Sequence, residues 1–174
     1  MAEPSPLTPA DAAAMLRGAA AAIAAEVRTL PDAIARWHPA PGEWCVNDVL
    51  GHLIEAERRG FAGRIRIMLE TAAPALEGWE PAAVARARRD CTKDTAGLLA
   101  DLVAMREAGA ALVAELTADD LARTARHPKV GDLTVREVLQ EWIYHDRNHL
   151  KQILANVQAW AWPHMGNTQK FTTM

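Results

Sequence analysis

Two histidines, His145 and His149, have the spacing that places two metal ligands on one face of a helix. They stand four residues apart, about one helical turn. Apolar residues continue the same face at three- and four-residue steps, namely Val138, Trp142 and Ile153. A buried imidazole without a polar partner costs free energy, so these ring nitrogens need one.

A third histidine, His52, lies on the inner face of another predicted helix, over residues 46–70. A neutral imidazole binds zinc, nickel, copper or iron, and three of them leave coordination positions for water or substrate. Such an open site is typical of a reactive metal rather than a structural one. The alternative is that each histidine is a core residue with ordinary hydrogen-bond partners, and the pattern alone leaves both interpretations open.

Several polar side chains lie near these histidines in the sequence. Glu55 and Glu141 are candidate catalytic groups, as a proton acceptor and as a polar neighbour or fourth metal contact; an ion pair or a solvated carboxylate is the alternative. Asp146 and Gln152 are candidates for orienting the ligand imidazoles. Asp146 points some 100° away from His145 on the helix, which also fits an exposed side chain.

Other chemical groups are given structural interpretations. Large aromatic residues can wall a cavity but are mostly core in bundles: Trp37, Trp44 and Trp142. Three histidines in loops or the tail, beside prolines, are expected at the surface: His38, His127 and His164. Four arginines flanked by acids predict a solvated face rather than an anion site: Arg58, Arg59, Arg64 and Arg66.

Composition indicates one soluble domain spanning residues 1–174. Half of the residues are hydrophobic, 24% are charged, and the net charge of −3 gives no basic surface for nucleic acid. The alanine-rich run over 10–25 carries Asp11 and Arg17, which argues against a membrane span. Cys45 and Cys91 are too few for a disulfide framework and lack metal-type spacing, and residues 1–6 do not resemble a signal peptide. We therefore expect reduced thiols and a cytoplasmic protein.

Apolar periodicity predicts four long helices, with short helical turns at 32–36 and 117–121 and loops at 72–81 and 127–132. The helices are expected over 8–30, 46–70, from 83 or 90 to 116, and 134–157. Along the second, His52, Ala56, Gly60 and Gly63 form a track of small side chains that suggests a close approach or a bend. Four long helices with two long connections predict an all-α four-helix bundle over about 8–158, with a loosely attached tail over 159–174.

Three segments, taken together, resemble the DinB-like superfamily. They are Trp44-Cys45-Val46-Asn47-Asp48-Val49-Leu50-Gly51-His52-Leu53, Gly131-Asp132-Leu133-Thr134-Val135-Arg136-Glu137-Val138-Leu139, and His145-Asp146-Arg147-Asn148-His149-Leu150-Lys151-Gln152-Ile153. The resemblance implies a four-helix bundle with two long crossovers, often dimeric, that holds a divalent metal on His52, His145 and His149. The sequence departs from the family pattern at Cys45, where a capping hydroxyl is usual.

Relatives in this superfamily include bacillithiol- and mycothiol-dependent transferases and isomerases and metal hydrolases. We therefore expect a homodimeric metal-dependent enzyme, with zinc or nickel, that acts on a small molecule as a low-molecular-weight-thiol S-transferase or a hydrolase. The alternative is a non-catalytic, stress-related interaction module with a closed four-ligand metal. A metal-free bundle is the third possibility.

Overall fold

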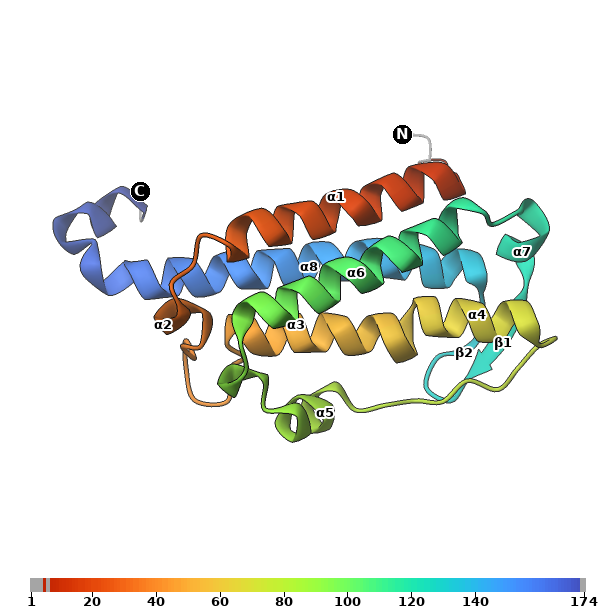
Figure 1. Cartoon of the computed structure of the whole chain (residues 1–174), viewed down its shortest axis with the longest axis horizontal. Coiled ribbons are helices and arrows are strands. Elements are labelled where there is room, and N and C mark those ends of the chain that lie inside the picture. The colour runs from red at the N-terminus through yellow and green to blue at the C-terminus, as the bar shows by residue number, and fades with distance from the viewer. Residues whose placement is uncertain (1–4, 6, 173–174) are drawn as a thin grey trace.

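Four helical segments run along one another in the computed structural model, which describes residue 5 and residues 7–172 (Figure 1). They are α1 (Pro9–Val27), α3 (Val46–Glu55) with its continuation α4 (Ala62–Glu70), α6 (Thr95–Ala114) and α8 (Val135–Ala161). Residues 1–4 and 6, where no signal peptide is expected, and residues 173–174 of the predicted tail lie outside the described residues. The predicted four-helix bundle is confirmed.

The order of the helices requires long connections. Figure 1 shows α3 and α6 running in the same direction, so the chain over 71–94 must return along the bundle, and it carries α5 (Pro81–Arg88) and η2 (Asp90–Thr92). The chain over 115–134 carries α7 (Ala118–Ala122) and a hairpin, while α2 (Asp32–Ala35) lies between α1 and α3. As a result α3 packs on both α6 and α8, which brings His52 to the helix that carries His145 and His149.

Local sequence explains where the helices begin. The hydroxyl of Thr134 accepts the backbone N–H of Glu137, and the Glu137 carboxylate accepts the N–H of Thr134, which together form a capping box. Cys45, where the family usually has a capping hydroxyl, caps α3 in the same way. Its Sγ accepts the N–H of Asp48 at 3.3 Å, and Asp48 Oδ2 accepts the N–H of Cys45 at 3.4 Å.

The second predicted helix is interrupted by one turn of π-helix, η1 (Ala56–Gly60). The track of small residues has its explanation here. A Cβ on Gly63 would lie 1.8 Å from the carbonyl oxygen of Arg58, so the close approach is made by the chain's own backbone. A π-turn of this kind is often found at functional sites.

The predicted loop over 127–132 is part of a hairpin. Strands β1 (Thr124–His127) and β2 (Gly131–Thr134) pair antiparallel, with Ala125 opposite Leu133. The predicted surface position of His127 is wrong, because its side chain is buried between the hairpin and α4 and lies 2.9 Å from Arg64.

Two further expectations differ from the structure. Helix α8 continues past residue 157 to Ala161 and is followed by η3 (Trp162–His164) and η4 (Gly166–Thr172), so the tail is mostly helical, and Trp160 packs edge-on against Trp37. Cys45 and Cys91, expected as free thiols, form a disulfide between the start of α3 and η2.

Among the described residues, no helix has the length and hydropathy that crossing a membrane requires.

Candidate metal centre

Three histidine side chains from two helices converge on one point. The Nε2 atoms of His52 and His145 lie 2.9 Å apart, and those of His145 and His149 lie 3.2 Å apart. Three nitrogens that each lie about 2.0–2.1 Å from a tetrahedral zinc ion are about 3.3 Å from one another. The observed nitrogen spacing therefore fits a single divalent ion held between α3 and α8.

The three imidazoles are in the protonation state that metal binding requires. Burial, with a smaller contribution from His149, lowers the pKa of His52 to about 3. Burial and the neighbouring histidines lower the pKa of His145 to about 2, and burial also lowers the pKa of His149. At neutral pH all three rings are uncharged and can offer a lone pair.

The other ring nitrogen of each ligand has its own surroundings. Nδ1 of His149 lies 2.9 Å from Oε1 of Gln152, which fixes the tautomer that leaves Nε2 free to bind a metal. This contact is the one that the sequence predicts for Gln152, which was expected to orient a ligand imidazole. The Nδ1 atoms of His52 and His145 are buried without a protein partner among the described residues.

Aromatic rings enclose the cluster. Trp44 lies 5.0 Å from the His52 ring and 6.3 Å from His149, and Trp79 stacks on His52 at 5.6 Å between ring centroids. Phe61 meets His145 edge-on at 4.9 Å. The sequence interpretation missed Trp79 and Phe61, because Trp79 lies in the crossover loop where no periodicity predicts its direction.

The other two predicted aromatic residues differ in their surroundings, and Trp37 also lines a cavity of about 910 Å³. Trp142 is fully buried and stacks on Phe61. Trp37 packs on Trp160, where it helps attach the end of α8.

Asp146 turns away from the cluster into a buried ion pair. Arg106 of α6, itself 1% exposed, donates from Nη1 and Nη2 to the two Asp146 oxygens and from Nε to Glu57 at 2.5 Å. The alternative of an exposed Asp146 is therefore wrong, since its carboxylate is completely buried. This contact fixes the rotation of α8 about its axis, and that rotation decides where His145 points.

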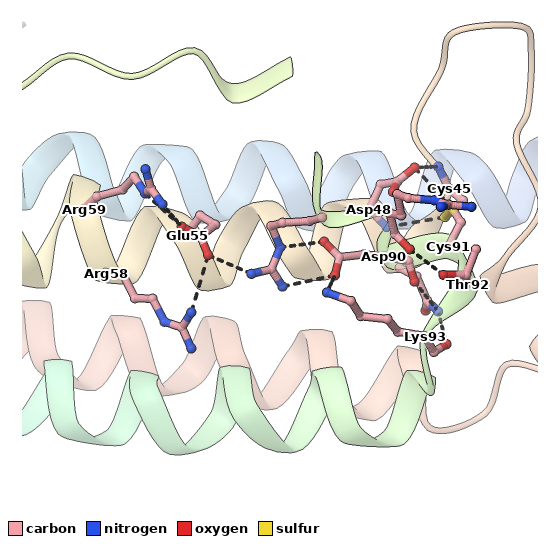
Figure 2. A network of polar contacts seen from close by, with 12 residues as sticks. Cys45, Asp48, Glu55, Arg58, Arg59, Asp90, Cys91, Thr92 and Lys93 are labelled. Atoms are coloured by element: carbon pink, nitrogen blue, oxygen red, sulfur yellow. Dashed lines mark hydrogen bonds and ion pairs between the residues drawn. A yellow bond between two sulfur atoms is a disulfide. The ribbon is translucent and has the colours of Figure 1, made fainter. Parts of the chain in front are cut away.

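Glu55 is the centre of a second polar network, drawn in Figure 2. Its carboxylate is 4% exposed and accepts from Arg88 at 2.7 Å, from Arg59 at 2.8 Å and from Arg58 at 3.5 Å. Arg88 also bonds Asp90, so the network ties the α5–η2 segment to α3. The geometry is that of the ion-paired alternative rather than of a free proton acceptor.

Glu141 lies outside the histidine group. Its side chain is exposed, and its electrostatic partners are Arg64 and His127 beside the hairpin. Within the part of the chain that the structure describes, no Cys, Asp or Glu joins His52, His145 and His149 as a fourth potential ligand.

Comparisons with known proteins agree with this fold. The sequence model of the DinB superfamily matches residues 15–153. The structure is similar to that of YfiT from Bacillus subtilis, with a TM-score of 0.82 and 20% sequence identity over 93% of this chain and 94% of that one. YfiT is described as a probable metal-dependent hydrolase with an unusual four-helix bundle topology. No curated protein matches the chain.

Proposed function

Since the chain belongs to the DinB superfamily, we propose that it is a divalent-metal-dependent enzyme whose open three-histidine site acts on a small molecule. The observation that carries the proposal is the convergence of three neutral imidazoles without a fourth protein ligand among the described residues. A closed shell of four side chains would instead indicate a structural metal.

The residues around the site have different roles. His52, His145 and His149 would hold the ion, and Gln152 keeps His149 in the binding tautomer. Trp44 and Trp79 exclude bulk water from two sides and offer flat apolar faces to a substrate. A bound divalent ion supplies Lewis-acid chemistry, which lowers the pKa of a water molecule or a thiol at the open position.

Two reactions use this arrangement, and we propose hydrolysis first. The structural neighbour YfiT is described as a probable metal-dependent hydrolase, and an activated water is the nucleophile that an open site on three histidines offers. Transfer of a low-molecular-weight thiol to an electrophile is the second candidate, since a thiol competes with water for the same position and softer donors suit zinc or nickel.

The deciding experiment compares metal-loaded and metal-free protein, prepared without a histidine tag. One arm measures hydrolysis of ester and amide panels without thiol, and the other measures consumption of a generic electrophile with bacillithiol, mycothiol, glutathione or cysteine. We expect turnover in one arm that requires metal and disappears in His149→Ala. Stoichiometric metal with four protein ligands and no turnover would favour a non-catalytic interaction module.

The proposal has a simpler requirement as well. Protein purified without a tag and supplemented with zinc or nickel should retain about one equivalent at the histidine site. Less than about one tenth of an equivalent would reject the site. Homodimerisation and a cytoplasmic location belong to the same proposal, and light scattering of the purified protein tests the first of them.

A further inference from the structure

A second group of side chains that could hold a metal lies where α3 begins. Cys45 is the cap of α3, Asp48 lies in its first turn, Cys91 comes from η2, and His38 comes from the connection after α2. One ligand atom from each of these four residues lies within 4.8 Å of the others. His38, Asp48 and Cys91 line a cavity of about 910 Å³, which gives solvent a route to the group.

The two cysteines are placed for either of two states. Their Cα atoms are 6.4 Å apart, and they form a disulfide in the structure. Two thiolates that each lie about 2.3 Å from a zinc ion have sulfurs about 3.8 Å apart. Since disulfide sulfurs lie about 2 Å apart, the reduced pair needs to separate by less than about 2 Å to accept an ion.

Asp48 supplies the negative charge that a cation in this group would neutralise. Oδ2 of Asp48 lies 3.1 Å from Sγ of Cys91 and 4.0 Å from Nδ1 of His38. A disulfide sulfur has no hydrogen to donate, so these two electron-rich atoms face each other. Among the described residues no lysine or arginine pairs with Asp48, because the neighbouring Arg88 and Lys93 both pair with Asp90 (Figure 2).

The start of α3 also favours the thiolate form of Cys45. Its Sγ accepts the backbone N–H of Asp48 at 3.3 Å, at the positive end of the helix dipole. Helix amino-termini lower thiol pKa values, and the thiolate is the form that binds metals.

We propose that Cys45, Cys91 and Asp48, joined by His38, bind a second tetrahedral divalent ion such as zinc in the reduced protein. The disulfide is then the oxidised, metal-free state of the same residues. Two sulfurs, one carboxylate oxygen and one imidazole nitrogen are a donor set that suits zinc. His38 is exposed with Nδ1 2.7 Å from the Glu43 carbonyl oxygen, and its ring gives up that contact when it binds through Nδ1.

The two states interconvert by thiol–disulfide exchange. Two molecules of a low-molecular-weight thiol reduce the bond between the sulfurs, giving two protein thiols and one small-molecule disulfide. The two thiols release two protons when the ion binds. A small-molecule disulfide reverses the sequence, reforming the protein disulfide and displacing the ion.

The test counts bound zinc by elemental analysis after dialysis, in protein that is reduced or oxidised. Reduced wild type is expected to bind about two equivalents and oxidised wild type about one. Reduced His149→Ala should bind about one equivalent and oxidised His149→Ala close to none, which separates this site from the histidine centre. Cys91→Ser should bind about one equivalent under both conditions.

Cobalt substitution gives a second measurement that does not depend on counting. Thiolate-to-cobalt charge-transfer absorption is expected in reduced wild type and reduced His149→Ala, and should be absent in Cys91→Ser and in both oxidised proteins. The oxidised wild type is a control without any substitution, so misfolding of a variant cannot produce the pattern. Equal zinc content in reduced and oxidised wild type, without thiolate absorption, would overturn the proposal.

Discussion

At the scale of single residues, each ligand histidine is held in place by a different contact. Gln152 bonds His149, aromatic rings of Trp44 and Trp79 enclose His52, and His145 is directed by its neighbour Asp146, which Arg106 anchors on the other side of α8. Removing one ligand should therefore disturb the metal more than the fold, since these supporting contacts remain.

We expect His149→Ala to lose metal at the histidine centre and to keep its helical circular dichroism. Two remaining imidazoles do not hold a divalent ion against dialysis, whereas the buried core around α8 is unchanged by the truncation. His164→Ala is the matched control, because His164 is exposed in η3 and far from the site in the chain. Metal retained at this centre in His149→Ala, for example with unchanged cobalt ligand-field absorption, would remove His149 from the ligand set.

The sequence was sufficient for the histidine group and insufficient for its supports. A four-residue spacing and an apolar stripe identify His145 and His149 because both are properties of one helix. The partner of Asp146 is 40 residues away, and Arg106 becomes its neighbour only because its long side chain crosses the core of the folded bundle from α6 to α8. The same holds for Cys91, which reaches Cys45 through the course of a crossover loop and not through any local pattern.

At the scale of helices, close packing depends on particular small residues. Gly109 of α6 lies against the Trp142 side chain in the core, and a Cβ built there would be 2.7 Å from the Trp142 ring and 3.1 Å from Glu57. Gly18 of α1 is exposed, and nothing lies within 4 Å of the same position. The two glycines therefore separate helix propensity from packing.

Gly18→Ala should raise the free energy of unfolding by about 0.5–1 kcal/mol, because alanine loses less backbone entropy in a helix. Gly109→Ala gains the same propensity but overpacks a rigid indole, so we expect a net loss of about 1–2 kcal/mol. Urea denaturation of both variants measures the difference. A stabilised Gly109→Ala would show that the Trp142 ring can move away from α6 without cost.

Helix starts were more predictable than helix interruptions. Thr134 followed three residues later by Glu137 is a pattern typical of a capping box, and the capping box forms. The π-turn after Glu55 has a weaker local signal, since the small residues up to Gly63 predict a close approach or a bend but do not say that the Arg58 carbonyl makes it. The hairpin was missed because each strand has only four residues and one pairs with Pro74 and Leu76 of the distant crossover.

At the scale of the whole molecule, the histidine centre is a stability cost that a metal offsets. His52 and His145 join α3 to α8 as neutral rings in a buried site, and the Nδ1 atom of each has no hydrogen-bond partner in the described part of the chain. An ion that binds only the folded chain raises its stability by mass action. The metal-free protein must instead exclude protons from these rings in order to stay folded.

Acid should therefore weaken the metal-free protein in a window set by these histidines. Their folded pKa values, about 3 for His52 and about 2 for His145, lie below the unfolded value near 6.5. Below about pH 6.5 the unfolded chain binds protons that the folded chain does not, so stability falls as pH falls, by up to about 1.4 kcal/mol per pH unit for each histidine.

Urea midpoints of metal-free protein between about pH 7 and 5.5 measure this slope. The buried carboxyls Glu57 and Asp146, whose pKa values are raised by burial, act in the opposite sense, but they are present in every variant compared, so differences in slope report the histidines. His145→Leu should have a shallower slope than the wild type, because one proton-excluding ring is gone, whereas the exposed control His164→Ala should keep the full slope. Equal slopes in all three proteins would mean that the histidine cluster takes up protons while the protein is folded. A cluster that protonates so readily could not hold a divalent ion at mildly acidic pH.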